Sequence, residues 1–364
     1  MEENPEPHIK FLDGGLGTTL ETNHGVKFSE STPLWSSHLL LTDLHTLTKC
    51  QSSFARAGAN IITTATYQVS INGFRNTKTE DWPNGVPPHK IGPFLHAAVR
   101  VARTAASEAG GQVALSLGPY GATMIPSTEY TGQYDIDPSE DMVYELYRWH
   151  RDRFTLFEKV HDLLSNVDYI AFETIPRIEE VKAIRECLSI HQVRAPVWIS
   201  VLFPGDDDKM PDGTSAEDAV TAMIGENYTN LGLCAPQFVG INCTRVSKLG
   251  GLVRKFTKTV ERLVAKRAVS KWPGLVLCPD GTRKGERYNT ETKEWEISEE
   301  GSNKEEEDMS WERQLALVIK EAKVSGEWSS IFVGGCCRTT PENISRLPGA
   351  FLEVMAEQEK DTTR

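Results

Sequence analysis

The sequence predicts an α/β fold, a (β/α)8 barrel of the TIM type, and three observations support this prediction. Eight short runs rich in Val, Ile and Phe alternate with longer segments whose apolar residues have helical spacing. The runs are almost continuously apolar, which is typical of parallel strands covered by helices on both faces. A length of 364 residues would allow two domains but also suits a single barrel, so we expect one domain over residues 1–364. An open, doubly wound sheet is the alternative architecture.

Each predicted strand is a short run of apolar residues that ends where polar residues or glycines begin. In chain order the strands are Ile9–Asp13, Ala59–Thr64, Gln112–Leu117, Val167–Glu173, Pro196–Leu202, Phe238–Asn242, Gly274–Pro279 and Ser330–Gly334. Strands of this kind, each followed by a helical segment, form the repeating unit of a βα barrel.

The helices between the strands are predicted from apolar spacing and from start signals. The segments Thr42–Ala57 and Ile178–Ile190 repeat apolar residues at helical spacing, so that each has one apolar face. The stretch Thr214–Glu217 is typical of a capping box at the start of a further helix. The dipeptide Thr340–Pro341 marks the start of the last helix, because proline is favoured at the first helical position.

Three segments depart from this repeat. Gly118–Pro138 is a long Gly- and Tyr-rich loop after the third strand, and Gly281–Asp308 is a polar insertion after the seventh strand. The strongly acidic part of that insertion, Glu299–Asp308, is expected to be a solvated segment without a chemical role. Asp206–Asp208 lies among Pro and Gly residues, so we interpret it as a solvated loop rather than a cation site.

The composition excludes several classes of partner. The chain has 39 Lys and Arg against 51 Asp and Glu, a formal charge of −12, which argues against a nucleic-acid or anionic-membrane surface. No apolar run reaches the roughly 18 residues of a membrane span, and the first residues show neither a signal-peptide nor a transit-peptide pattern. Seven cysteines, an odd number, fit reduced thiols better than a disulfide framework. We therefore expect a cytoplasmic protein whose partners are small molecules.

Three cysteines are predicted to meet at the carboxyl-terminal rim of the barrel, where active sites of this fold lie. Cys243 follows the sixth strand, and Cys336 and Cys337 follow the eighth. Three thiolates with one open coordination position match a catalytic zinc site. Gly334–Gly335 would let the backbone bend so that both adjacent sulfurs face one ion. The residues alone also allow buried cysteines without a ligand, or a disulfide between Cys336 and Cys337.

Six rim segments carry short motifs rich in Gly, Thr and Cys. The motifs are DGGLGT at Asp13–Thr18, GANIITTATYQ at Gly58–Gln68, GPYGA at Gly118–Ala122, ETIP at Glu173–Pro176, GINC at Gly240–Cys243 and GGCCRTTP at Gly334–Pro341. Together, and in this order, they resemble the homocysteine S-methyltransferase family, in particular the branch that uses S-methylmethionine or S-adenosylmethionine. The Gly-Gly-Cys-Cys-Arg stretch with an upstream Asn-Cys is the most specific part of the match.

This resemblance implies a (β/α)8 barrel that binds one Zn²⁺ per chain, with Cys243, Cys336 and Cys337 as the ligands. It further implies that Asp13 and Glu173 hold the amino group of homocysteine.

The resemblance also assigns a role to Gly14, Gly15 and Thr64, which would help to hold the substrate carboxylate through backbone and hydroxyl donors. One departure lies after the seventh strand, where the family usually has Tyr-Pro-Asn-Ser-Gly and Cys278–Thr282 of this chain is CPDGT. This change makes the contacts of that loop uncertain, and Cys278 is not expected to be a zinc ligand.

The activity that the resemblance implies is zinc-dependent methyl transfer from a sulfonium donor to the thiolate of L-homocysteine, which gives methionine. A sulfonium can be held by aromatic faces, and the rim offers the candidates Trp35, Tyr120, Tyr130 and Tyr134. Two alternatives stay open. One is the same chemistry with another donor such as a betaine, and the other is a non-catalytic zinc or thiol sensor on the same barrel. The sequence leaves the oligomeric state open.

Overall fold

The structure confirms the predicted barrel of parallel strands. It is a computed structural model that describes residues 7–29, 31–191, 193–225, 233–282, 286–289, 294–297 and 309–362. Eight strands form one sheet in the order β1-β10-β7-β6-β5-β4-β3-β2, with every neighbouring pair parallel. A bridge between Leu12 and Ile61, and a hydrogen bond from the Asn60 amide to the Phe11 carbonyl oxygen, bring β1 against β2. These contacts close the ring, as a barrel requires and an open sheet does not.

The barrel strands end where the predicted rim segments begin. Their bounds are His8–Phe11 (β1), Ile61–Thr63 (β2), Gln112–Leu117 (β3), Tyr169–Ile175 (β4), Val197–Val201 (β5), Phe238–Arg245 (β6), Gly274–Asp280 (β7) and Ser330–Val333 (β10). Two further strands, Glu286–Asn289 (β8) and Glu294–Ile297 (β9), pair antiparallel within the insertion after β7. The acidic stretch Glu299–Asp308, which we expected to be solvated, lies outside the described residues.

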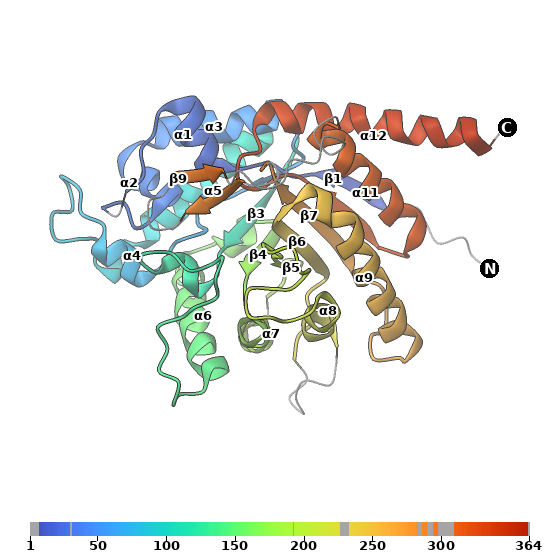
Figure 1. The fold of residues 1–364 in the computed structure, drawn as a ribbon. Coiled ribbons are helices and arrows are strands. Elements are labelled where there is room, and N and C mark those ends of the chain that lie inside the picture. Colours follow the sequence, from blue (N-terminus) through green and yellow to red (C-terminus); the bar gives the residue numbers. More distant parts are fainter. Residues whose placement is uncertain are drawn as a thin grey trace.

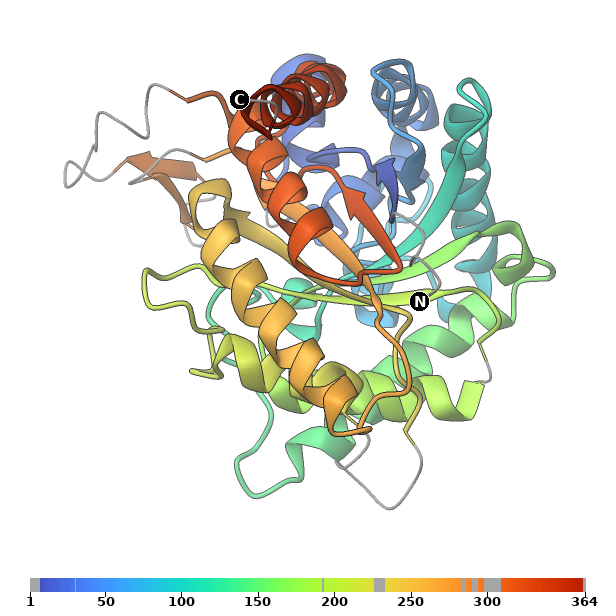
Figure 2. The same ribbon diagram turned by 90° about the vertical axis from the view of Figure 1, so that its right-hand side faces the viewer.

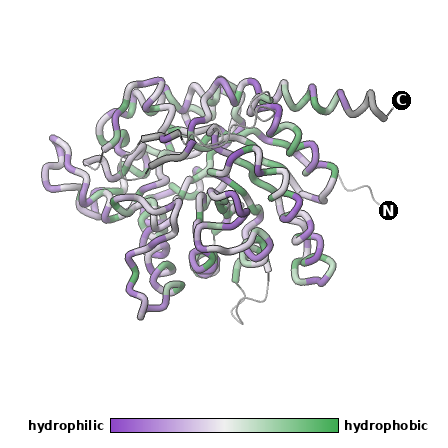
Figure 3. Tube along the Cα trace, viewed as in Figure 1, coloured by the Kyte–Doolittle hydropathy of each residue, from purple (hydrophilic) through white to green (hydrophobic). Residues whose placement is uncertain are grey.

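Helices cover the outside of the strands, and the two orthogonal views show this arrangement (Figure 1, Figure 2). Their bounds are Leu16–His24 (α1), Leu39–Thr42 (α2), Leu44–Arg56 (α3), Ile71–Asn76 (α4), Gly92–Ser107 (α5), Met142–Glu158 (α6), Ile178–His191 (α7), Ala216–Ile224 (α8), Val246–Ala265 (α9), Trp311–Ser325 (α11) and Pro341–Thr362 (α12). Hydrophilic residues are frequent in the peripheral loops, whereas hydrophobic stretches lie mainly toward the interior (Figure 3). Within the described ranges, no helix combines the length and apolar character that a transmembrane span requires.

Two of the four predicted helix starts are confirmed, at Ile178 (α7) and Pro341 (α12), and the other two differ by one or two residues. The helix α3 begins at Leu44 because Asp43 accepts a hydrogen bond from the Thr46 amide. The cap of α8 is Ser215, whose hydroxyl accepts from the Asp218 amide, so the capping pair is shifted by one residue from the predicted Thr214–Glu217 box.

Aromatic side chains fill the barrel interior toward the amino ends of the strands. Tyr169, Trp198, Phe238 and Phe332 extend from β4, β5, β6 and β10, and their ring centroids lie 4.5–6.3 Å apart. The Lys10 ammonium lies 5.6 Å from the ring centroids of Tyr169 and Phe332 and donates a hydrogen bond to the Tyr169 hydroxyl at 3.0 Å. This aromatic cluster packs the barrel at one end, so a substrate-sized cavity is left to the other end.

Truncation of the aromatic cluster tests how much it stabilises the barrel. We expect Phe332→Ala to lower the free energy of unfolding by about 3–5 kcal/mol, because the change leaves a cavity among three other rings. The measurement is urea denaturation followed by circular dichroism. The control is Leu352→Ala on α12, since Leu352 is 68% exposed and should change stability by less than about 0.5 kcal/mol. Equal losses in the two variants would contradict this role for the cluster.

Candidate active site at the carboxyl ends of the strands

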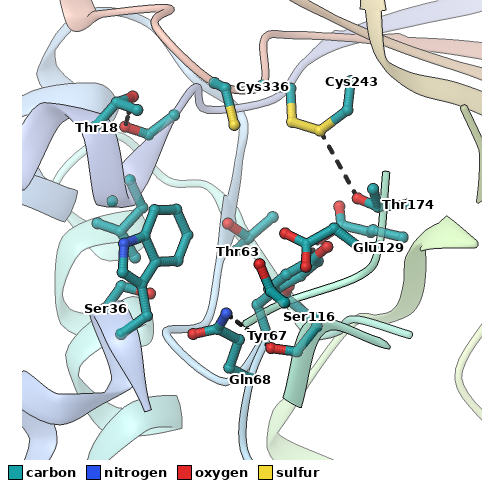
Figure 4. A pocket seen from close by; sticks show the side chains of 18 of the residues that line it. Thr18, Ser36, Thr63, Tyr67, Gln68, Ser116, Glu129, Thr174, Cys243 and Cys336 are labelled. Atoms are coloured by element: carbon teal, nitrogen blue, oxygen red, sulfur yellow. Dashed lines mark hydrogen bonds between the residues drawn. A yellow bond between two sulfur atoms is a disulfide. The ribbon is translucent and has the colours of Figure 1, made fainter. Parts of the chain in front are cut away.

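A cavity opens at the carboxyl ends of the strands, where the fold predicts an active site (Figure 4). The expected site residues that line it are Asp13, Gly14, Gly15, Trp35, Thr64, Glu173, Cys243, Cys336 and Cys337. Tyr120, which we also expected at the site, is not part of the cavity lining. Segments far apart in the sequence therefore meet here, and the fold brings nearly all of the predicted residues to one place.

Three sulfur atoms meet at the wall of this cavity. The Sγ atoms of Cys243, Cys336 and Cys337 all lie within 4.8 Å of one another. Cys243 and Cys336 form a disulfide, whereas Cys337 is a free thiol. The sequence predicted reduced thiols and gave Cys336–Cys337 as the alternative disulfide. In the structure five of the seven cysteines are free thiols, and the one pair is Cys243–Cys336 rather than Cys336–Cys337, because β6 and the loop after β10 bring the sulfurs of Cys243 and Cys336 together.

The backbone is irregular at the ends of β4 and β6, which carry two of the site residues. The register of β4 against β5, and that of β6 against β7, shifts near the carboxyl end. Thr174 (φ 61°) and Cys243 (φ 46°) lie at these shifts in the left-handed region, which is unfavourable for residues other than glycine. Because a strand bulge re-aims the side chains beside it, the bulge in β6 turns Cys243 toward the cavity. Glu173, in contrast, continues the inward alternation of Tyr169 and Ala171.

The side chain of Asn242 links the two bulged strand ends. Its Oδ1 accepts a hydrogen bond from the Thr174 amide at 2.8 Å, and its Nδ2 donates to the Thr174 hydroxyl at 2.7 Å. The same Nδ2 lies 3.5 Å from the Sγ of Cys243 and 3.9 Å from that of Cys336. Asn242 thus holds the strained backbone in place and also directs an N–H group at the sulfur cluster.

The loop after β10, which carries two of the cysteines, is tied to β1 and β7. The amide of Gly335 donates to the carbonyl oxygen of Asp13, and that of Cys336 donates to the carbonyl oxygen of Pro279, both at 2.9 Å. A Cβ on Gly334 would lie 2.6 Å from the Asp13 carbonyl oxygen. Neither glycine has a positive φ. Glycine is therefore needed here for close approach of the two loops, rather than for the bend that the sequence suggested.

The chemistry of the sulfur cluster fits zinc. Three sulfur ligands satisfy three positions of a tetrahedral ion and leave the fourth for a substrate atom. Burial raises the pKa of the Cys337 thiol to about 12, so a cation close to the sulfur is needed to keep it ionised at neutral pH. Cys278 lines the cavity but is not in the sulfur cluster found among the described residues, in line with our expectation that it is not a ligand.

Two buried carboxylates line the same cavity. The Oδ2 of Asp13 accepts hydrogen bonds from the Thr63 amide at 2.8 Å and the Thr63 hydroxyl at 3.0 Å. The Oε2 of Glu173 accepts from the Ser116 hydroxyl at 2.7 Å. Burial raises the pKa of both carboxyl groups to about 7, and the charge of Asp13 contributes to the shift of Glu173. Both groups would therefore be stabilised in their ionised form by a bound cation.

The groups expected to hold a substrate carboxylate are partly engaged within the protein. The Gly15 amide donates to the carbonyl oxygen of Thr339 at 3.0 Å and to its hydroxyl at 3.1 Å, so it is not available to a substrate in this structure. A Cβ on Gly15 would lie 2.5 Å from the Cys336 carbonyl oxygen, which makes this glycine a spacer between two loops. The Thr64 hydroxyl accepts from the Ser116 amide at 3.1 Å and lies 2.6 Å from the Thr66 hydroxyl.

Three aromatic side chains line the cavity, namely Trp35, Tyr67 and Tyr130. The Tyr130 hydroxyl lies 3.6 Å from the Sγ of Cys337. The Tyr67 ring packs directly on Gly118, where a Cβ would lie 2.7 Å from a ring carbon. These rings offer faces to a cationic substrate close to the sulfur cluster.

The other two aromatic candidates lie away from the cavity. The Tyr120 hydroxyl donates to Asp135 at 2.6 Å, and its ring contacts Tyr134 with centroids 5.1 Å apart. The Tyr134 hydroxyl donates to the buried carboxylate of Glu180. The hydroxyls of both tyrosines are therefore satisfied by other protein groups, and neither tyrosine reaches the cavity lining.

A buried arginine joins the loops after β2 and β3. Arg153 on α6 donates to the carbonyl oxygens of Gly118 and Tyr67, both at 2.6 Å, and to that of Thr66 at 3.1 Å. Burial lowers its pKa to about 9, which still leaves it charged at neutral pH. These bonds hold the Tyr67 segment against the loop that carries Tyr130.

Sequence reasoning missed Glu129, Glu21 and the linking role of Asn242. Glu129 and Glu21 both line the cavity. One signal for Glu129 was present, because it directly precedes the aromatic candidate Tyr130 in a loop already assigned to the rim. The Asn242 contacts depend on two strand bulges, for which the sequence carries no readable signal.

Comparison with known proteins agrees with this geometry. The sequence model described as homocysteine S-methyltransferase matches residues 10–351. Homocysteine S-methyltransferase 2 of Zea mays is 30% identical over 92% of this chain and 88% of its own length. Selenocysteine Se-methyltransferase of Brassica oleracea var. italica is 30% identical over 93% of this chain and 87% of its own length.

Solved structures show the same relationship. The homocysteine methyltransferase MmuM from Escherichia coli has been solved in a metallated and in an oxidized form. Each form superposes on this chain with a TM-score of 0.63 at 26% identity. The alignments cover 94% of this chain and 96% or 95% of the MmuM chains.

Replacement of Asn242 by Asp tests its effect on the sulfurs separately from its effect on the backbone. Asp keeps an oxygen that accepts from the Thr174 amide but loses the N–H group and adds a negative charge beside the sulfurs. We expect Asn242→Asp to weaken zinc binding by about 10- to 100-fold, measured on the reduced protein by competition with a chromophoric chelator. The control is Ser139→Ala on the exposed loop before α6, which should not change the affinity. Unchanged zinc affinity in Asn242→Asp would contradict this role.

Proposed function

Because this chain belongs to the homocysteine S-methyltransferase family, we propose that it transfers a methyl group from a sulfonium donor to the thiolate of L-homocysteine, in a zinc-dependent reaction that gives methionine. The proposed donor is S-methylmethionine or S-adenosylmethionine.

The observation that carries this proposal is the charge of the cavity lining. Four carboxylate side chains line the cavity beside the three sulfurs, namely Asp13, Glu21, Glu129 and Glu173. Among the described residues of the lining there is no Lys, Arg or His. A sulfonium donor that is also an amino acid carries a net charge of +1, whereas a betaine is neutral overall. The lining therefore favours the sulfonium donor.

In the proposed acceptor site, Asp13 and Glu173 hold the ammonium group of homocysteine and so direct its side chain at Cys243, Cys336 and Cys337. Bound zinc supplies the positive charge that keeps the substrate thiol ionised at neutral pH. The three cysteines hold this metal in their thiolate form, and Asn242 donates toward two of the sulfurs. Gly14 and Thr64 form the wall beside the substrate carboxylate, with Gly15 as the spacer beneath it.

The transfer is a direct displacement at the methyl carbon. The homocysteine sulfur provides the electron pair for the new C–S bond. The old C–S bond breaks with its electron pair staying on the donor sulfur, which becomes a neutral thioether. The negative charge of the thiolate and the positive charge of the sulfonium neutralise each other in this step, and a water-poor cavity favours such neutralisation. The faces of Trp35, Tyr67 and Tyr130 stabilise the sulfonium before transfer, and no proton has to be moved by the protein in this step.

The disulfide between Cys243 and Cys336 is incompatible with zinc binding by the same two sulfurs. The proposed active form is therefore the reduced one, which fits a cytoplasmic location, where thiols are kept reduced. We further propose that residues 1–364 act as one homocysteine-binding domain. With a betaine donor, Asp13 and Glu173 would keep their role toward homocysteine, but the donor itself would bring no net positive charge to match Glu21 and Glu129.

A comparison of methyl donors tests the proposed function. The reduced, zinc-loaded protein is given L-homocysteine with S-methylmethionine, S-adenosylmethionine or glycine betaine separately, and methionine is measured. We expect methionine from at least one sulfonium donor and none from betaine. Cys336→Ser should lose zinc and turnover together, whereas Cys234→Ser, at an exposed cysteine outside the cavity, should lose neither. Methionine from betaine alone would favour the alternative methyl donor. Tight zinc binding without any turnover would favour the non-catalytic sensor.

The raised pKa values of Asp13 and Glu173 predict how ligand binding depends on pH. A bound ammonium favours the ionised carboxylates, so binding releases protons and becomes tighter as the pH rises through about 7. We expect the Kd of L-methionine, a product that has no thiol proton to lose, to fall about 10- to 100-fold from pH 6 to pH 8, since each of the two carboxyl groups contributes up to about tenfold. Isothermal titration with the zinc-loaded protein measures it. A Kd that is constant over this range, or that rises with pH, would contradict the assignment.

A further inference from the structure

Glu129 is a carboxylate that lines the cavity and has no role in the proposed acceptor site. It lies in the loop between the short helix Tyr120–Thr123 (η3) and α6, and it lines the cavity that contains the sulfur cluster (Figure 4). Its Oε2 atom is shielded from solvent and has no hydrogen-bond partner. A buried acceptor without a partner is unfavourable in a folded protein, and a ligand that donates a hydrogen bond removes this penalty.

The surroundings of Glu129 indicate what kind of ligand this is. Burial raises the pKa of its carboxyl group to about 7, and the Ser127 hydroxyl offsets this only in part. Its neighbours in the cavity include the Tyr67 and Tyr130 rings, whose phenol pKa values its charge helps to raise. No basic side chain stands among the described lining residues. A ligand that both donates N–H and carries positive charge would satisfy the atom and stabilise the carboxylate.

The ammonium group of homocysteine already has a proposed binding site. In the proposed function, homocysteine gives its ammonium to Asp13 and Glu173. Both of these have hydrogen-bond partners in the structure, from Thr63 and Ser116. A sulfonium centre has no hydrogen to donate, so it cannot satisfy the Oε2 of Glu129. The remaining group with the required chemistry is the α-ammonium of an amino-acid donor.

We propose that Glu129 binds the α-ammonium group of the methyl donor and thereby selects sulfonium donors that are amino acids. The proposal rests on the function proposed above and deepens it by giving the donor its own recognition residue.

The position of Glu129 relative to the sulfurs fits this role. The next residue, Tyr130, extends to the sulfur cluster, where its hydroxyl lies 3.6 Å from the Sγ of Cys337. A donor held by its ammonium at Glu129 can therefore lie along the Tyr130 ring, with its sulfonium directed at the sulfur cluster. Three carbon atoms separate nitrogen from sulfur in such a donor, so it is short enough to lie within the one cavity that Glu129 and the three cysteines line. The substrate sulfur and the transferred methyl group then meet beside the three cysteines.

The loop that carries Glu129 is built to hold it in one place. The Thr128 amide donates to the Gly121 carbonyl oxygen at 2.9 Å, and the Gly132 amide donates to the Thr128 carbonyl oxygen at 2.8 Å. A Cβ on Gly121 would lie 3.1 Å from the Glu129 nitrogen and 2.7 Å from the Tyr134 ring. Tyr134 in turn donates to the buried Glu180. A recognition residue needs such a fixed backbone, because a mobile carboxylate gives less selectivity.

A substrate that lacks only the amino group tests the proposal on the zinc-loaded, reduced protein. The two donors are S-methylmethionine and (3-carboxypropyl)dimethylsulfonium, which is the same molecule without its amino group. We expect the wild-type protein to have a kcat/KM about 10- to 100-fold higher with S-methylmethionine, as is typical of a hydrogen bond between charged groups. Glu129→Gln keeps the shape of the side chain and removes the charge. It should raise the KM for S-methylmethionine by a similar factor and leave the KM for homocysteine within about twofold, so that this variant no longer distinguishes the two donors.

The matched control is Glu140→Gln, which makes the same charge change at an exposed residue of the same loop and should retain the wild-type preference. Glu129→Asp, which keeps the charge on a shorter side chain, should lose less than Glu129→Gln. If Glu129→Gln does not fold, the proposal is still tested by the donor preference of the wild-type protein and of Glu129→Asp. Equal use of the two donors by the wild-type protein, or a rise in the KM for homocysteine instead of the donor, would overturn the proposal while leaving the proposed function intact. Failure of both donors, and of S-adenosylmethionine in the donor comparison above, to give methionine would overturn the two together.

Discussion

The site depends on one constraint, namely that two bulged strand ends must be held side by side. Thr174 and Cys243 have left-handed backbone, and the Asn242 side chain bonds to Thr174 through its oxygen and its nitrogen. Without the bulge in β6, Cys243 would face away from the cavity, because the regular alternation from Phe238 places Asn242 and not Cys243 on the inward face. The strain at the two residues is offset by buried hydrogen bonds, and this local cost brings the sulfur of Cys243 to the cavity that Glu173 also lines.

The cavity combines features that are unfavourable in the free protein. Burial raises the pKa of Asp13, Glu129 and Glu173 to about 7. The unfolded chain ionises these groups near pH 4, so they stabilise the folded state less as the pH rises from about 4 to about 7. The substrates proposed above would reverse this penalty, because each would bring an ammonium group and the donor would also bring a sulfonium. The buried carboxylates thus lower the stability of the free protein and increase its affinity for cationic ligands.

The geometry of the sulfur cluster allows two chemical states, one in which the sulfurs bind a metal ion and one in which two of them form a disulfide. Three sulfurs within 4.8 Å of one another are close enough to share a metal ion and close enough for two of them to form a disulfide. The same ties hold them in both cases. Asn242 directs its amide nitrogen at Cys243 and Cys336, and the loop after β10 is bonded to β1 and β7. MmuM, a related protein, has been solved both in a metallated form and in an oxidized form.

The sequence by itself determined the eight strands, the helices between them and the segments that reach the rim, because alternating apolar periodicities and short Gly- and Cys-containing motifs are local properties. It also identified the family and placed Asp13, Trp35, Glu173 and the three cysteines at one rim. The tertiary structure decided that the sheet closes between β1 and β2, since an open sheet has the same local pattern. Only the tertiary structure decided which aromatic residues enter the cavity: Tyr130 faces it and Tyr120 does not, because Asp135 engages the Tyr120 hydroxyl. It also revealed the acceptor of Glu129 that has no partner, since this can be seen only when all of its neighbours are known. Bulges, hydrogen-bond partners and close approaches of glycine depend on residues distant in the chain, and no local pattern carries that information.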